Sequence, residues 1–104
     1  MIGNYKGHYP FNESSILTNA PNNIGVYYCG ILNSDGSLGV LYVGRAKGEN
    51  VTIRSRLLEH LNNDKWYDVT HFGFYPCSSE EEIENFEKLE IAHLNIPKYN
   101  KRIG

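Results

Sequence analysis

Two tyrosines, an arginine, a histidine and a run of glutamates have the side chains that hydrolysis of a phosphodiester bond requires. The reaction needs a deprotonated attacking oxygen, relief of charge in the transition state and stabilisation of the leaving oxygen. A carboxylate that holds a divalent cation supplies the last two, and an arginine can contact two phosphate oxygens at once. A phenol can take the proton of water once nearby cations lower its pKa from the unperturbed value of about 10. The candidates are Tyr27, Tyr42, Arg56, His60 and one glutamate between residues 80 and 90.

The two tyrosines lie in short tripeptides, Gly25-Val26-Tyr27 and Tyr42-Val43-Gly44, within runs of apolar, β-branched and aromatic residues. Such runs predict strands over 24–32 and 39–45. The turn-forming Asn33-Ser34-Asp35-Gly36 between them indicates a hairpin with a loop or bulge. Pairing of these strands can bring the two phenols to one place on the sheet.

The arginine and the histidine fall in a predicted helix over 51–62, where apolar residues recur every four positions. Arg56 and His60 are one turn apart on one edge of the apolar stripe. Arg54 lies on the opposite flank of the helix. We therefore expect Arg56 and His60 to face the same site, and Arg54 to face away from it.

The rest of the chain completes an α+β domain. A third strand is predicted over 69–77, and a second helix over 79–94, which Pro97 prevents from continuing. The order strand, strand, helix, strand, helix predicts a three-stranded antiparallel sheet flanked by helices. Residues 1–22 are polar, with prolines at positions 10 and 21, and are expected to form an N-terminal arm before a single domain over 23–104.

Two glutamates lie on the apolar side of the second predicted helix. A helical projection places Glu87 and Glu90 each between two apolar residues. A carboxylate that faces a core is costly unless it is paired or binds a metal ion. Both glutamates are therefore candidate metal ligands, and the projection does not separate them.

The net charge of −2 argues against a strong general affinity for DNA. Six of the twelve acidic residues lie in the second predicted helix, however, with Lys88 as its single basic residue. The rest of the chain carries nine basic against six acidic residues, which predicts a locally basic face. The basic residues expected to contact nucleic acid are Arg45, Lys47, Arg54 and Lys98.

Cysteine usage and hydropathy favour a cytoplasmic protein. Cys29 and Cys77 fall in predicted strands without the spacing of a zinc site, so we expect buried, reduced thiols. No apolar run has the length of a membrane span, and the first residues lack the apolar region of a secretory signal. We expect an intracellular protein that does not bind membranes.

The ordered set of motifs resembles the GIY-YIG nuclease family, with Gly-Val-Tyr in place of the first tripeptide. The resemblance covers about residues 23–100. The segment 42–47 is similar to that of homing endonucleases and of the nuclease subunit of bacterial excision repair. The spacing Arg56-x-x-x-His60 is similar to that of the homing endonuclease branch, and Pro97-Lys98-Tyr99-Asn100 to the C-terminal motif of the family.

This resemblance implies an endonuclease that hydrolyses DNA with one divalent cation, Mg²⁺ or Mn²⁺. The spacing to the C-terminal motif favours Glu87 over Glu90 as the metal ligand. Tyr27 is expected to accept the proton of water, with Tyr42 as its water-orienting partner, and Asn100 to support the site structurally. Family members often take their specificity from an appended domain, so specificity here would come from loops, the N-terminal arm, a homodimer or a partner protein.

One departure from the family leaves a second interpretation open. The segment between Tyr42 and Arg56 is longer than is usual in the family, which predicts an insertion around residues 48–51. Without an insertion, Thr52 would occupy the place of the arginine, which would call catalysis into question. The alternative is a non-catalytic module that uses the same fold to bind nucleic acid or protein; a phosphodiesterase of small substrates is a third possibility, for which no feature argues directly.

Overall fold

Seven helices and strands follow one another in the computed structural model, which describes residues 2–64 and 66–100. All five elements expected from the sequence are present, with bounds within two residues of the predicted ones. The last four residues of the predicted domain, 101–104, lie outside the described part of the chain. In chain order the elements are β1 (Lys6–Pro10), α1 (Glu13–Asn19), β2 (Gly25–Leu32), β3 (Leu38–Ala46), α2 (Ile53–Asn63), β4 (His71–Pro76) and α3 (Glu80–His93).

The sheet has four antiparallel strands in the order β1-β4-β2-β3, so the prediction of three strands was wrong by one. The additional strand, β1, comes from the expected N-terminal arm and pairs with β4, with Lys6 opposite Phe74 and Pro10 opposite His71. Residues 6–10 are polar and have no apolar alternation, so their own sequence does not mark a strand. A proline is tolerated because β1 is an edge strand. The predicted α+β class is confirmed.

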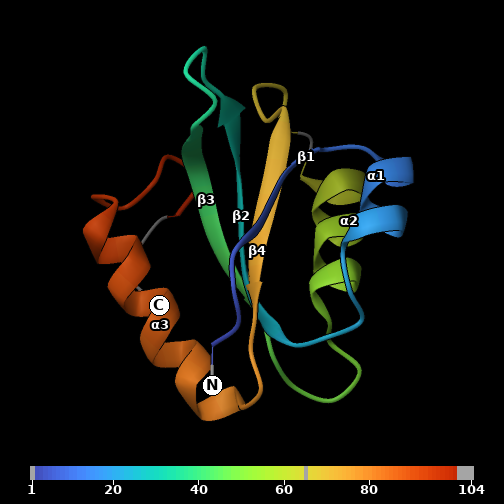
Figure 1. Ribbon diagram of the computed structural model, residues 1–104, viewed down its shortest axis with the longest axis vertical. Helices are drawn as coiled ribbons and strands as arrows, with labels where there is room; N and C mark the ends of the chain where they lie inside the picture. Colours follow the sequence, from blue (N-terminus) through green and yellow to red (C-terminus); the bar gives the residue numbers. More distant parts are fainter. Residues whose placement is uncertain (1, 65, 101–104) are drawn as a thin grey trace.

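The sheet is the middle of three layers, with α1 and α2 on one face and α3 on the other (Figure 1). Successive side chains of a strand point to opposite faces, and this alternation divides the core in two. Tyr27 belongs to the buried cluster beneath α1 and α2, together with Ile16 of α1. Tyr28, the next residue, belongs to the cluster beneath α3. The two tyrosines of β2 therefore serve different faces of the sheet.

The two cysteines are both buried and neither forms a disulfide, as the sequence predicted. Cys29 lies in β2 and Cys77 follows β4. Within residues 2–64 and 66–100, no helix is both long and apolar enough to cross a membrane.

Candidate active site

The rings of Tyr27 and Tyr42 share a space that a glycine leaves open. Tyr27 lies opposite Gly44 in the pairing of β2 with β3. A Cβ atom at Gly44 would lie only 2.3 Å from Cζ of Tyr27 and 2.6 Å from Cε2 of Tyr42. The two ring centroids are 6.2 Å apart. The glycine of the Tyr42-Val43-Gly44 motif is therefore a packing requirement of the two phenols.

Substitution of Gly44 by alanine is expected to lower the free energy of unfolding by about 3 kcal/mol, because the new methyl group would overlap the Tyr27 ring. Gly39→Ala is the matched control in the same strand, since its Cβ would meet nothing closer than the Asn33 side chain at 3.3 Å. It should change stability by no more than about 1 kcal/mol. Urea denaturation measures both; an unaffected Gly44→Ala variant would contradict this packing.

A chain of hydrogen bonds connects Tyr27 to α2. The Tyr27 hydroxyl lies 2.7 Å from Nε2 of His60, and Nδ1 of His60 bonds the carboxylate of Asp64. An ionised carboxylate can only accept, so Nδ1 carries a proton and Nε2 of the neutral ring accepts from the Tyr27 hydroxyl. The three side chains form a path along which a proton can leave the phenol.

Burial decides the protonation of this path. Tyr27 is fully buried, and burial raises its pKa well above the usual value, with Tyr42 adding to the rise and Arg56 opposing it. Burial also lowers the pKa of His60, against the opposing effect of its bond to Asp64. Both groups are therefore neutral at pH 7. The cationic lowering of the phenol pKa that we expected is outweighed by burial at Tyr27.

Tyr42 is the more accessible of the two phenols. It is only partly buried, whereas Tyr27 has no exposed surface. Burial raises the Tyr42 pKa as well, while the charge of Arg56 and the hydroxyl of Tyr27 act to lower it. Its ring also contacts that of His60, with centroids 5.0 Å apart. Tyr42 thus stands between the solvent and the buried path.

Arg56 lines a cleft of about 490 Å³ between the end of β3 and α2. Its Nη1 lies 2.5 Å from Oε1 of Glu59, and its side chain is 30% exposed. Arg54 is not among the lining residues, because its Nε donates to the carbonyl of Ala20 at 2.8 Å. The two arginines therefore face different surroundings, as the helical projection indicated. The cleft is lined by Arg45, Lys47, Asn50, Val51, Ser55, Arg56 and Glu59.

The loop before α2 explains why Arg56 and not Thr52 lines the cleft. Gly48 and Asn50 have left-handed backbone angles, with φ of 108° and 63°. The chain then enters α2 through Thr52, whose side chain accepts from the Ser55 N–H as the N-cap. Thr52 is thus committed to capping the helix, and the first full turn brings Arg56 to the cleft.

The two candidate glutamates of α3 have different neighbours. Glu87 is 6% exposed, and its Oε1 lies 3.5 Å from Nη1 of Arg45. Burial raises the pKa of Glu87, while the charges of Arg45 and Arg56 act against the rise. Glu90 instead accepts a hydrogen bond from the hydroxyl of Tyr28, on the α3 face of the sheet. Glu87 is the glutamate that lies near Arg45, Arg56 and Tyr42.

Glu87 has the environment of a ligand for a divalent cation. Its Oε1 is buried and receives no hydrogen bond, and Arg45 is close enough to attract its charge without bonding it. A buried carboxylate oxygen in this state is costly, and a bound cation would satisfy it. The described residues contain no group of three or more metal-ligating side chains. A cation held here would therefore take most of its ligands from water and phosphate, as Mg²⁺ commonly does.

The basic residues expected to contact nucleic acid do not all lie at the cleft. Arg45 and Lys47 line it, and both pair with Glu84 of α3, at 3.7 Å and 2.7 Å. Lys98 pairs with Asp68 at 2.7 Å instead, and Arg54 bonds the carbonyl of Ala20, the residue that follows α1. Two of the four predicted residues thus line the cleft, and Glu84 pairs with both.

Asn100 and Trp66 contact the elements that carry the site residues. Asn100 bonds the backbone of β3, and Trp66 stacks on the ring of His60. The amide of Asn100 bonds both the N–H and the carbonyl of Val43, each at 2.8 Å. Trp66 lies parallel to the ring of His60, with centroids 4.7 Å apart, and to that of Tyr99, at 5.2 Å. The asparagine fixes the strand that carries Tyr42, and the indole fixes the imidazole.

Sequence reasoning missed Asp64, Trp66 and Glu84. Asp64 could have been found, because it lies four residues after His60 and such a spacing places both on one helix face. Trp66 lies beyond the end of α2, where no periodicity indicates its direction. Glu84 was considered only as part of an acidic helix, and its contact with the cleft depends on how α3 packs.

Comparisons of the chain with protein-family models, with curated proteins and with solved structures find no match.

Proposed function

We propose that the protein is an endonuclease that hydrolyses phosphodiester bonds of DNA with one divalent cation. The observation that carries the proposal is the buried path Tyr27–His60–Asp64, which adjoins Tyr42 and Arg56 and lies near the unsatisfied carboxylate of Glu87. A packing role alone would not require a phenol, an imidazole and a carboxylate in series. Each of these groups has a function in the chemistry of a phosphodiester.

The proton of the attacking water would leave through the two phenols. Tyr42 is the more exposed, so it is better placed than Tyr27 to receive this proton, the reverse of the order that the family resemblance suggested. Tyr42 would give its own proton to Tyr27 as it takes the proton of water, and Tyr27 would pass its proton to Nε2 of His60. Asp64 would stabilise the imidazolium that forms. In this way two phenols with high pKa values can act as a base without becoming stable phenolates.

Arg56 and Glu87 would deal with the charge of the phosphate. Arg56 would exchange Glu59 for phosphate oxygens, since this pair is exposed and held weakly. Glu87 would hold Mg²⁺ or Mn²⁺, which when bound would relieve charge in the transition state and stabilise the leaving oxygen. Arg45 and Lys47 would release Glu84 to contact the backbone of the DNA.

Substitution of Arg56 by alanine tests this proposal. Wild-type protein should nick supercoiled plasmid in Mg²⁺, and Arg56→Ala should lose this activity by about 10²-fold or more, as expected for removal of a donor to a transition-state charge. Arg54→Ala is the matched control in the same helix, because its bond to Ala20 is structural. It should cleave normally and lose only about 1 kcal/mol of stability.

The opposite result, with Arg54 essential and Arg56 dispensable, would contradict the assignment of the cleft. Wild-type protein that binds DNA without nicking it in either cation would instead favour a non-catalytic binding module. One observation favours this second function: Arg45 and Lys47 are already paired with Glu84, in a protein of net charge −2. Binding measured by fluorescence anisotropy, beside nicking, distinguishes the two.

A further inference from the structure

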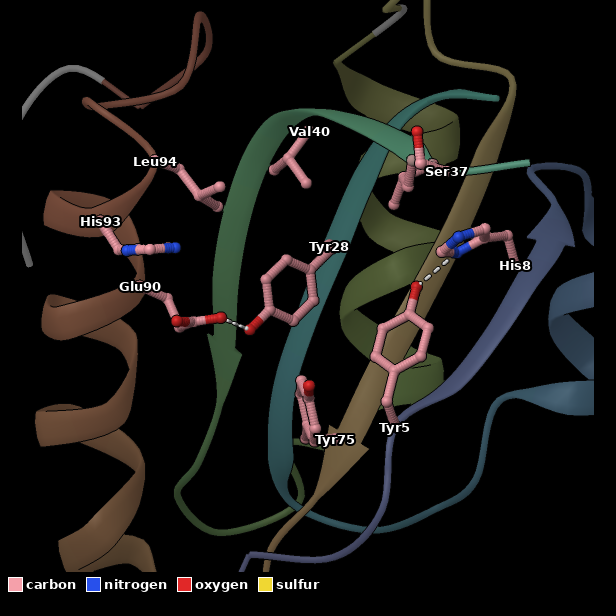
Figure 2. A pocket seen from close by; sticks show the side chains of 10 residues that line it. Tyr5, His8, Tyr28, Ser37, Val40, Tyr75, Glu90, His93 and Leu94 are labelled. Carbon is pink, nitrogen blue, oxygen red and sulfur yellow. Dashed lines mark hydrogen bonds between the residues drawn. The ribbon is translucent and has the colours of Figure 1, made fainter. Parts of the chain in front are cut away.

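A second concave site lies on the opposite face of the sheet from the candidate active site. It has a volume of about 380 Å³, within the range of pockets that hold small molecules. Figure 2 shows Glu90 and His93 of α3 and the C-cap residue Leu94 on one side of it. Tyr28 of β2 and Tyr75 of β4 lie in the middle, and Tyr5 and His8 lie at β1 on the other side. Ser37, Leu38 and Val40 complete the lining.

Three tyrosine rings form the aromatic part of this pocket. The centroid of Tyr5 lies 6.1 Å from that of Tyr28 and 5.2 Å from that of Tyr75, and the last two are 5.9 Å apart. All three pairs are tilted by 62–71°, so the ring planes face different directions. The face of an aromatic ring carries partial negative charge. Rings turned at steep angles can therefore present negative faces to one cation.

The charge of the lining points the same way. Glu90 is the one acidic side chain among the ten lining residues, and none of the ten is a lysine or an arginine. The pocket also adjoins the last turn of α3, and the C-terminal end of a helix is negative. A carboxylate, a helix end and three ring faces thus each favour a cation in this pocket.

The carboxylate is held in place but not neutralised. Tyr28 donates its hydroxyl to Oε1 of Glu90, which fixes the carboxylate toward the sheet. Within residues 2–64 and 66–100, Glu90 takes part in no salt bridge. His8 is bonded to the Tyr5 hydroxyl at 2.6 Å, and the described residues contain no group of three or more His, Cys, Asp or Glu side chains that could hold a metal ion. A cation that enters the pocket would therefore meet a carboxylate that Tyr28 orients and that no basic side chain of the described residues pairs with.

We propose that this pocket binds an alkylammonium cation, with the rings of Tyr5, Tyr28 and Tyr75 around the cationic head and Glu90 as its counter-charge. The same chemistry is offered by a free amine and by a lysine side chain of a partner protein, methylated or not. The pocket shares no lining residue with the cleft of Arg56, so the binding proposed here does not depend on the proposed nuclease activity.

Choline and its neutral isostere 3,3-dimethylbutan-1-ol test the proposal, because they have the same shape and differ in charge. In ¹H–¹⁵N NMR titrations, choline should shift the amide signals of residues around Tyr28 and Glu90 but not those of α2. It should bind at least about fivefold more tightly than the isostere, as a cation–π site requires. Equal affinity for the two, or no shift by choline at 10 mM (roughly the weakest binding that such a contact allows), would overturn the proposal.

Two variants assign the binding to the pocket. Glu90→Gln should weaken choline binding about fivefold or more without affecting the isostere, and Tyr75→Leu should weaken choline as well. Tyr67→Leu is the matched control, because Tyr67 is 93% exposed and does not line the pocket. Thermal unfolding establishes that each variant is folded. Unchanged choline affinity in Glu90→Gln would overturn the role of the carboxylate.

A further titration with two peptides distinguishes a free amine from a lysine side chain as the source of the cation. A short peptide with one trimethyl-lysine is compared with the same peptide containing norleucine at that position. Tighter binding of the methylated peptide than of choline would identify a partner's side chain as the occupant. Affinity equal to that of choline would identify the cationic head alone, as in a free amine, and preference for the norleucine peptide would overturn the proposal.

Discussion

Replacement of Glu87 by glutamine is expected to reduce nicking of plasmid DNA in Mg²⁺ by about 10³-fold or more. Glutamine preserves the shape of the side chain but removes the negative charge that attracts the cation, whose stabilisation of the transition state is worth several kcal/mol. Chelation of the metal should abolish wild-type cleavage to the same extent. The measurement is the initial rate of nicking at saturating Mg²⁺ and at saturating Mn²⁺.

The same variant should be more stable than the wild type when no metal is bound. Burial raises the pKa of Glu87 in the folded protein, so the ionised carboxylate disfavours folding above its unfolded pKa, and this penalty disappears as the pH falls. Glutamine removes the penalty at neutral pH. The free energy of unfolding of Glu87→Gln should thus exceed that of the wild type at pH 7, and the difference should shrink in acid.

Glu90→Gln is the matched control for this experiment. Glu90 lies one turn further along α3, but it bonds Tyr28 on the other side of the sheet from the phenol pair. Its substitution should leave nicking unchanged. If Glu87→Gln is fully active and Glu90→Gln is inactive, the metal ligand is Glu90 and not Glu87. If both variants cleave at the wild-type rate, neither glutamate of α3 holds a catalytic metal ion.

The sequence predicted the elements of the fold where composition or side-chain periodicity was strong. The runs around Tyr27 and Tyr42 are rich in apolar, β-branched and aromatic residues, and the apolar stripe of α2 recurs at each helical turn, so their bounds were close. Strand β1 has neither alternation nor β-branched residues, and it exists because β4 offers it a partner. The pairing of β1 with β4 depends on the assembled sheet, so the sequence of residues 6–10 alone does not predict it.

The candidate site also has residues that the local sequence predicts and residues that depend on how the elements pack. The types and order of Tyr27, Tyr42, Arg56 and His60 are readable from the sequence because they depend on strand pairing and on one helix face. The choice between Glu87 and Glu90 is not, since both flank the apolar arc of α3. It is decided by the packing of α3 against the sheet, which places Glu87 beside Arg45 and Glu90 beside Tyr28.

Removal of single hydroxyl or carboxylate groups from the buried path should slow cleavage without unfolding the protein. Tyr27→Phe and Tyr42→Phe each retain the ring that fills the space above Gly44, so circular dichroism and unfolding by urea should change little. Cleavage should fall by about 10²- to 10⁴-fold in each, the usual contribution of general acid–base catalysis. Both measurements use the plasmid assay under conditions in which the wild type makes one nick.

Asp64→Asn separates a proton path from simple packing, because it changes the pH dependence of the rate. His60 must be neutral to accept a proton, so wild-type cleavage should rise with pH through a pKa below the ordinary histidine value and then level off. The Asp64 carboxylate raises that pKa against burial. Its loss should therefore lower the plateau rate and move the acid limb to still lower pH. A wild-type profile in Asp64→Asn, or wild-type rates in both phenylalanine variants, would mean that these side chains only pack, and the proposed route of the proton would be wrong.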